Sequence, residues 1–353
     1  SGAENRHQNR STTMITRTVQ QQIRDLIVRT DPDLPPARTT AAQGPFQLAR
    51  DLIEDQWSLA APDPDVLAVM FGVLDGFFDQ LTDAGLGDLP PVQEQPALFL
   101  VAAADLQRWH LRKNTLMAAY AALRTHGLGP VSTPVAGLRP GAKLGSADRR
   151  KPRKRVATSD EVLLARVCAR LDTRDDLHRR AAALAIGGAG AATGEGAQAR
   201  WCDVTRPASQ IPGGTLALAG RHHHNPANGW HVAARAVDLD AWATTALTDW
   251  YTETSSAGRP VQDDWSIVYD GKQALTSQSA KNSYDHHINL TLQAADLAWI
   301  PGLTAASIGE WGAAHAGLHH PDGLDQAARV MGVDPMNCLR KLTKASDRAY
   351  KPR

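Results

Sequence analysis

The charges of this chain are sharply partitioned along the sequence. Residues 51–105 contain eleven acidic residues and no Lys or Arg, whereas residues 106–155 contain twelve basic residues and one acid. The basic residues are densest in the Pro- and Gly-rich stretch 139–156, which is too polar to bury a core. We interpret that stretch as an extended basic linker that divides the chain into two folded parts.

Length and composition agree with two folded parts. The chain has 353 residues, of which 42% are hydrophobic and 21% charged, and this is typical of globular proteins. No apolar stretch approaches the roughly 18–20 residues of a membrane span, so we expect no membrane association. Three well-separated cysteines, Cys168, Cys202 and Cys338, argue against a disulfide framework or a zinc ribbon and favour a cytoplasmic protein.

The pattern before the linker is helical. Residues 1–45 are taken as an N-terminal tail or arm, and residues 46–138 as a helical domain. Its expected helices are 46–59, 66–84 with Asp65 as the cap, 97–111 and 115–125.

Residues 157–353 show a mixed pattern. Thr158 opens a capping box for the first helix, and further helices are expected at 175–187, 239–254, 277–295, 305–317, 324–331 and 335–344. Two short strands, 215–219 and 229–234, interrupt them. The fold class predicted is therefore mainly α with a small β insertion (α+β).

Several motifs invite functional interpretations that the spacing does not support. The glycine-rich stretch 187–194 lacks the Gly-Lys-Ser/Thr of a phosphate-binding loop. The histidine runs 222–224, 286–287 and 319–320 lack an HExxH or Cys/His pattern, so we predict no metal and no cofactor. Residues 326–341 have the outline of a helix-turn-helix, although two packed helices with a glycine turn look the same.

The second half resembles the catalytic domain of the tyrosine recombinase (phage integrase) family. Residues 190–204 resemble the family's "GLRxSELxxLxWxDV" segment, with Glu195, Trp201 and Asp203 in register. Residues 303–315 resemble "LTPHxLRHTFATH", and residues 330–333 resemble "LLGH". The helical first half then resembles the family's core-binding domain by pattern alone.

The resemblance implies a reaction for which this chain lacks the side chains. The family cleaves DNA with a tyrosine nucleophile; two arginines stabilise the transition state, a lysine protonates the leaving oxygen, and histidines assist proton transfer. At the corresponding positions, which we call the degenerate positions, this chain has Ala192, Arg221, Ala306, Gly309, Val333 and Leu342. Only Arg221 is a cation, and a guanidinium is a poor proton donor. We therefore predict no catalytic residues and a pseudoenzyme.

The basic residues predict double-stranded DNA as the partner, because each neutralised phosphate releases counterions. The alternative is that the linker is a solvated tether without a binding partner. The expected DNA-binding residues are Arg108, Arg112, Lys113, Arg124, Arg149, Arg150, Lys151, Arg153, Lys154, Arg155, Arg200, Arg221, Arg340 and Lys341. The acidic residues of 51–105 would repel DNA, so we expect them to face a second copy or another protein, or simply solvent.

Three functions compete at this stage. The leading hypothesis is a catalytically inactive recombinase-like protein of the nucleoid that clamps duplex DNA, as a transcriptional regulator or architectural factor. The alternative is an active or partner-complemented site-specific recombinase. A protein-interaction module that has lost DNA binding is the third, and the basic linker argues against it.

Overall fold

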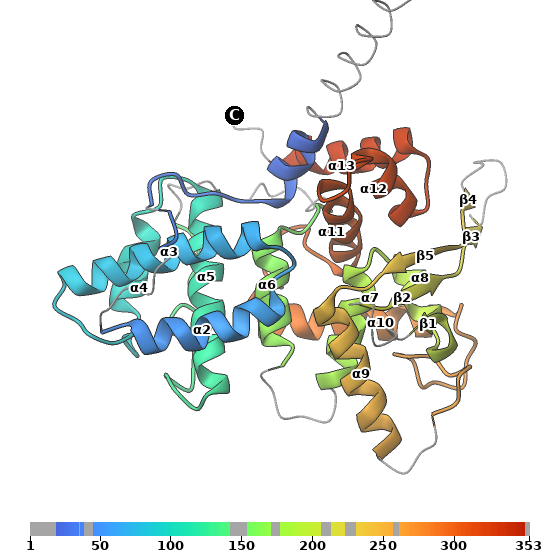
Figure 1. Cartoon of the computed structure of the whole chain (residues 1–353), viewed down its shortest axis with the longest axis horizontal. Helices are drawn as coiled ribbons and strands as arrows, with labels where there is room; N and C mark the ends of the chain where they lie inside the picture. The colour runs from blue at the N-terminus through green and yellow to red at the C-terminus, as the bar shows by residue number, and fades with distance from the viewer. Residues whose placement is uncertain are drawn as a thin grey trace, which may run out of the picture.

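The computed structural model describes residues 19–34, 36–38, 45–141, 154–170, 177–205, 213–222, 231–256 and 261–349. Most of the linker lies outside these residues. The chain forms a helical N-terminal half and a larger C-terminal half that combines helices with short strands (Figure 1). This architecture confirms the fold class predicted from the sequence.

Within its described residues, the N-terminal half has helical residues at 19–27 and the helices α2 (Gln47–Ala60), α3 (Pro64–Asp83), α4 (Glu94–Val101) and α5 (Leu106–Thr125). Two expectations are corrected here. Asp63, not Asp65, caps α3, because its Oδ1 accepts from the Val66 N–H at 2.9 Å and Pro64 follows at the first helical position. Asp105 caps α5 through its side chain as well, so the break expected at 112–114 lies instead at 102–105, between α4 and α5.

The C-terminal half contains eight helices within the described residues; seven follow the expected positions, and the short helix α8 was not predicted. They are α6 (Ser159–Cys168), α7 (Leu177–Gly188), α8 (Thr193–Gln198), α9 (Ala241–Ser256), α10 (Gln278–Ala294), α11 (Ala305–Leu318), α12 (Gly323–Met331) and α13 (Pro335–Ala349). The capping box predicted at Thr158 is present, with Glu161 as its third-position partner. Gly332 ends α12 in the left-handed conformation, at φ 69°.

The β insertion is a small antiparallel sheet with a short arm. Strand β2 (Thr215–Leu218) lies between β1 (Val204–Thr205) and β5 (Arg235–Asp238), with Thr215 opposite Asp238. Strands β3 (Arg221–His222) and β4 (His231–Val232) extend the β2–β5 hairpin as a separate pair. The second strand was expected at 229–234, whereas the strand that pairs with β2 is β5, at Arg235–Asp238.

A single hydrophobic core runs through both halves. Helix α6 lies between them (Figure 1), and every one of its residues is buried. No helix in the described residues is both long and apolar enough to cross a membrane.

Buried ion pairs at the start of α6 join the two halves. Arg29 donates to Asp160 Oδ2 at 3.0 Å and to Glu161 Oε1 at 2.9 Å, and Asn114 donates to Asp160 at 2.8 Å. Burial raises the pKa of Glu161, but the charges of Arg155 and Arg29 outweigh it and hold that pKa well below the usual range. The carboxylate therefore stays ionised at the joint between the halves.

Candidate functional site

Two of the degenerate positions, Ala192 and Gly309, lie close together where the segment between α7 and α8 meets α11. Helix α11 lies directly on the backbone of residues 187–192: a Cβ at Gly309 would be 2.5 Å from the Ala191 carbonyl oxygen. A Cβ at Gly312 would be 2.2 Å from the carbonyl oxygen of Gly188. Backbone atoms thus occupy the space that a side chain at Gly309 would need. Ala192 and Gly309, which the family resemblance identified as two catalytic positions, are therefore close together in the structure.

A buried arginine on strand β5 of the sheet forms hydrogen bonds at the edge of the same region. Arg235 on β5 donates to Glu195 Oε1 at 2.7 Å and to Glu195 Oε2 at 3.0 Å, and its Nε donates to the Val330 carbonyl at 2.6 Å. The side chains of Arg235 and Glu195 are 7% and 0% exposed. Glu195 Oε2 also accepts from the Ala192 N–H at 3.0 Å. Its carboxylate therefore ties this guanidinium to the start of α8.

The rim of this region carries more carboxylates than cations. Lys154 Nζ lies 2.8 Å from Glu310 on α11, and Thr193 donates to Asp285 on α10 at 3.0 Å. Burial raises the pKa of Asp285, against the opposing effects of Thr193 and the positive charge of Lys154. Two carboxyl groups and one ammonium group are a poor environment for a phosphate that gains negative charge during cleavage.

No degenerate position supplies a nucleophile or a proton donor from its described side chain. Leu342 on α13 is 2% exposed, Gly309 is buried, and Val333 is half-buried. Ala192 and Ala306 are half-buried and have only methyl groups. The side chain of Arg221 lies outside the described residues, and so does Tyr350, the tyrosine that follows the degenerate position Leu342 in the sequence.

A tyrosine, Tyr284, lies close to the degenerate position Ala192. Tyr284 on α10 packs against the α7–α8 segment, where a Cβ at Gly196 would be 2.3 Å from its ring. The side chain is 1% exposed, and its hydroxyl has no hydrogen-bond partner among the described residues. Burial also raises the pKa of this phenol, which disfavours the phenolate. Tyr284 is therefore positioned as a core residue.

Two of the expected DNA-binding residues are part of the core. Arg112 is 4% exposed, with its Nε 2.7 Å from Asp31 Oδ2 and its guanidinium over the ring of Phe99. Lys113 is 2% exposed and donates to Asp296 at 2.6 Å. The structure corrects the expectation for both, because side chains buried in ion pairs do not reach phosphates.

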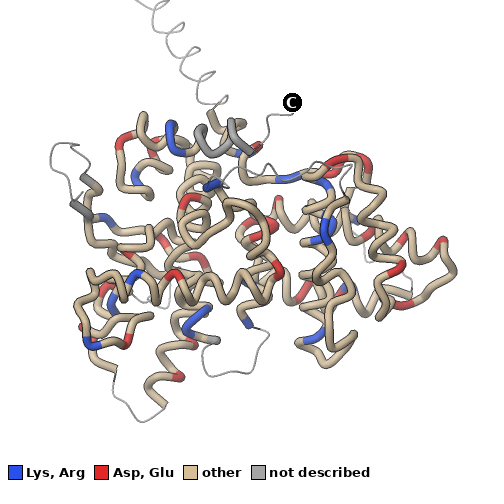
Figure 2. Tube along the Cα trace, turned by 180° about the vertical axis from the view of Figure 1, so that it is seen from behind, with Lys and Arg blue, Asp and Glu red and all other residues tan. Residues whose placement is uncertain are grey.

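The other described candidates are at least partly accessible, and most are paired. Arg108 lies among Asp31, Asp33 and Asp105. Arg155 bonds Glu161, and Lys154 bonds Glu310. Arg124 is half-buried and donates to the Val131 carbonyl, Arg200 and Arg340 are exposed, and Lys341 is half-buried. Arg149, Arg150, Lys151 and Arg153 lie outside the described residues. Seen from behind, the described cations alternate with acidic residues along the trace and form no separate basic face (Figure 2).

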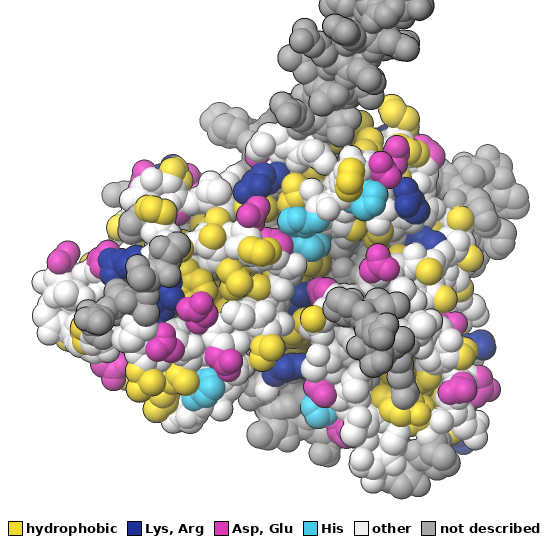
Figure 3. All heavy atoms as spheres, in the orientation of Figure 1, with side chains coloured by type: hydrophobic (Ala, Val, Ile, Leu, Met, Phe, Trp, Pro, Cys, Tyr) yellow, Lys and Arg dark blue, Asp and Glu magenta, His cyan; other side chains and the backbone are white. Residues whose placement is uncertain are grey.

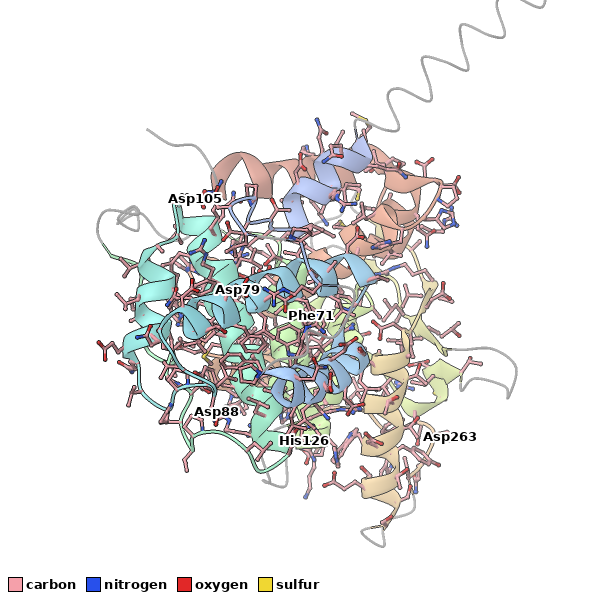
Figure 4. The ribbon with its side chains drawn as sticks, turned by 60° about the vertical axis from the view of Figure 1, so that its left-hand side comes forward. Phe71, Asp79, Asp88, Asp105, His126 and Asp263 are labelled. Carbon is pink, nitrogen blue, oxygen red and sulfur yellow. The ribbon has the colours of Figure 1, made fainter. Side chains whose placement is uncertain are left out.

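About half of the acidic residues of 51–105 are paired with basic side chains, although that region itself contains no Lys or Arg. Six of its eleven acids contact a basic side chain, in each case one from outside the region: Glu54, Asp63, Asp65, Asp75, Asp79 and Asp105. Asp79, Asp88 and Asp105 are also well separated over the N-terminal half, as Figure 4 shows. The region forms no concentrated negative patch.

Comparison with known proteins finds likeness in structure alone. No family model and no curated protein matches the chain. The structure of XerA recombinase is 12% identical, with a TM-score of 0.38, and the match covers 86% of this chain and 98% of that chain. XerH site-specific recombinase bound to a palindromic difH substrate is 14% identical, with a TM-score of 0.40 and coverage of 94% and 91%.

A lambda integrase dimer bound to a COC′ core site is also similar, with 14% identity, a TM-score of 0.35 and coverage of 86% and 79%. These three structures come from the family that the sequence resembles. The likeness is one of fold, and identities this low say nothing about which residues act. The candidate site therefore rests on the geometry of this chain.

Proposed function

We propose that this chain is a tyrosine-recombinase-like protein that binds duplex DNA without cleaving it, as a transcriptional regulator or an architectural factor. The main support for the proposal is the close packing of backbone atoms around Gly309. Backbone atoms fill the space of a side chain there, and Glu195 holds the nearby guanidinium of Arg235. In-line attack on a phosphodiester needs cations at the phosphate and a nucleophile, whereas the described cations near Gly309, Arg235 and Lys154, are held by Glu195 and Glu310, and the nearby Tyr284 is buried.

DNA binding is proposed from the basic linker together with Lys154 and the exposed Arg200 and Arg340. Binding through such cations is mainly electrostatic and tolerant of sequence. A clamp that takes DNA between the halves would have to break the buried pairs of Arg29 with Asp160 and Glu161, at a cost of several kcal/mol. We therefore propose contact on the outer surface near Gly141 and Lys154, the described residues on either side of the undescribed part of the linker.

The proposal is tested by fluorescence anisotropy with labelled duplex fragments of the source genome, over a series of salt concentrations. The expected result is binding at low salt, with an affinity that falls steeply as salt increases. Absence of binding to every fragment at low salt would contradict the proposal. A footprint on the fragments that bind best then identifies a site for the cleavage assay.

A further inference from the structure

Three side chains that the proposed function does not use meet at the joint between the two halves. Asp63 is the cap of α3 in the N-terminal half, and His315 and His319 lie near the end of α11 in the C-terminal half. The Nε2 atoms of His315 and His319 are 3.2 and 3.7 Å from Asp63 Oδ2. One ligand atom from each of the three residues lies within 4.8 Å of the others.

The two most buried atoms of this cluster lack hydrogen-bond partners. Asp63 is 7% exposed, and its Oδ1 accepts from the Val66 N–H while its Oδ2 accepts no bond from the described residues. His315 Nε2 is likewise without a hydrogen bond, although it lies 3.2 Å from that same oxygen. A buried oxygen and a buried nitrogen that face each other without sharing a proton are costly, unless a third group lies between them.

The geometry suits a metal ion as that third group. Histidines four residues apart on a helix present their rings on the same side, as in helical zinc sites. Tetrahedral coordination at 2.0–2.1 Å separates ligand atoms by about 3.3 Å, and the two distances from Asp63 Oδ2 to the histidine nitrogens, 3.2 and 3.7 Å, are near this value. The ring of Trp311 stacks on His315 with centroids 4.8 Å apart, which fixes the orientation of that imidazole.

The ligand set also indicates the class of ion. Two imidazoles and one carboxylate are typical of zinc and other divalent first-row transition ions, whereas calcium and magnesium prefer oxygen ligands alone. Histidine side chains are visible on the molecular surface at the position of α11 (Figure 3), and the His319 side chain is 41% exposed. One side of the cluster is therefore accessible to the ion and to a water molecule as fourth ligand.

We propose that Asp63, His315 and His319 bind one divalent transition-metal ion, zinc being the ion that this ligand set fits best, and that the ion joins the two halves of the chain. Because Asp63 belongs to one half and both histidines to the other, binding contributes to the stability of the joint only while the halves remain docked.

The test uses the full chain, freed of metal with a chelator and titrated with Zn²⁺ alone by isothermal titration calorimetry. We expect one ion per chain. His319→Ala and Asp63→Asn should each weaken binding about 100-fold or more, since even partners outside the coordination shell are worth 10- to 100-fold. Asparagine still caps a helix, so Asp63→Asn removes the carboxylate but keeps the start of α3.

Two controls separate this site from other histidines. His320→Ala changes the neighbouring imidazole, and a triple serine variant at 222–224 removes the histidine run, and both should bind Zn²⁺ like the wild type. Zn²⁺ should also raise the melting temperature of the wild type and of His320→Ala but not of His319→Ala. The proposal is overturned if Zn²⁺ does not bind, if His319→Ala binds equally well, or if binding disappears only with the 222–224 run.

Discussion

Arg235 and Glu195 form a buried bidentate ion pair, with nitrogen–oxygen distances of 2.7 and 3.0 Å. The pair joins β5 to α8, and the third bond of the arginine, to the Val330 carbonyl, adds the end of α12. Three elements of the C-terminal half thus converge on one guanidinium, beside the degenerate positions Ala192 and Val333. Its donors are directed at protein acceptors, so we assign Arg235 a structural role.

Replacing one member of this pair should destabilise the protein. Glu195→Gln leaves the guanidinium buried without its counter-charge, so we expect the free energy of unfolding to fall by about 3–5 kcal/mol. Urea denaturation measures this change. A double variant, Glu195→Gln with Arg235→Met, should recover part of the loss, because no unpaired charge remains.

Arg329→Ala is the matched control, because Arg329 pairs with Asp322 at 3.7 Å while 63% exposed, and its loss should change stability little. If Arg235→Ala had no effect on stability yet abolished DNA binding, Arg235 would be a phosphate ligand and the structural assignment would be wrong.

The close approach of α11 to residues 187–192 predicts the effect of adding one methyl group. In Gly309→Ala the new Cβ would meet the Ala191 carbonyl at 2.5 Å, so we expect a loss of about 1–3 kcal/mol despite the better helix propensity of alanine. Gly141→Ala is the control, since a Cβ there has no described atom within 4 Å. Equal melting temperatures for the two variants would show that the space at Gly309 is open.

The Lys113–Asp296 pair predicts a dependence of stability on pH. Burial raises the pKa of Asp296, but bonds from Lys113, Arg139 and the Gly137 N–H lower it more, so the folded-state pKa lies below that of the unfolded chain. The stabilisation is therefore fully present above about pH 4, the ordinary value for an aspartate, and is lost as the pH falls through the lower folded value.

Denaturation of wild type and Asp296→Asn between about pH 7 and pH 3 tests this dependence. The wild type should be more stable at neutral pH, and the difference should shrink as the pH decreases. A difference that stays constant over this range would mean that the charge of Asp296 contributes nothing.

The linker cations should set the salt dependence of DNA binding. Replacing Arg149, Arg150 and Lys151 with alanine removes up to three phosphate contacts, so the slope of log affinity against log salt should flatten by up to about 3. The matched control removes the same charge from paired surface arginines, Arg38, Arg170 and Arg329. Equal losses in the two triple variants would show that net charge acts without a defined contact.

Local patterns predicted the helices well because capping and periodicity are local properties. Thr158 with Glu161 marks the start of α6, and Gly332 marks the end of α12. The break between α4 and α5 was missed because apolar residues continue across it, and only the bond from the Arg108 N–H to Asp105 shows where the new helix begins.

The candidate site was harder to predict because its partners are distant in the sequence. Arg112 and Lys113 look like ordinary cations on a helix, and their acids, Asp31 and Asp296, lie 81 and 183 positions away. Glu195 stood in register with a family motif, but nothing local connects it with Arg235. The four-residue spacing of His315 and His319 was visible, and it was overlooked in favour of adjacent histidines.

The most direct test of the central claim is a covalent-trapping assay with a nicked duplex that contains the footprinted DNA site. An active tyrosine recombinase on its own site serves as the positive control. We predict that the protein shifts the duplex in a native gel yet leaves no denaturant-resistant protein–DNA adduct and no cleaved strand. An adduct that forms with the wild type and disappears in Tyr350→Phe would contradict the account and establish an active recombinase.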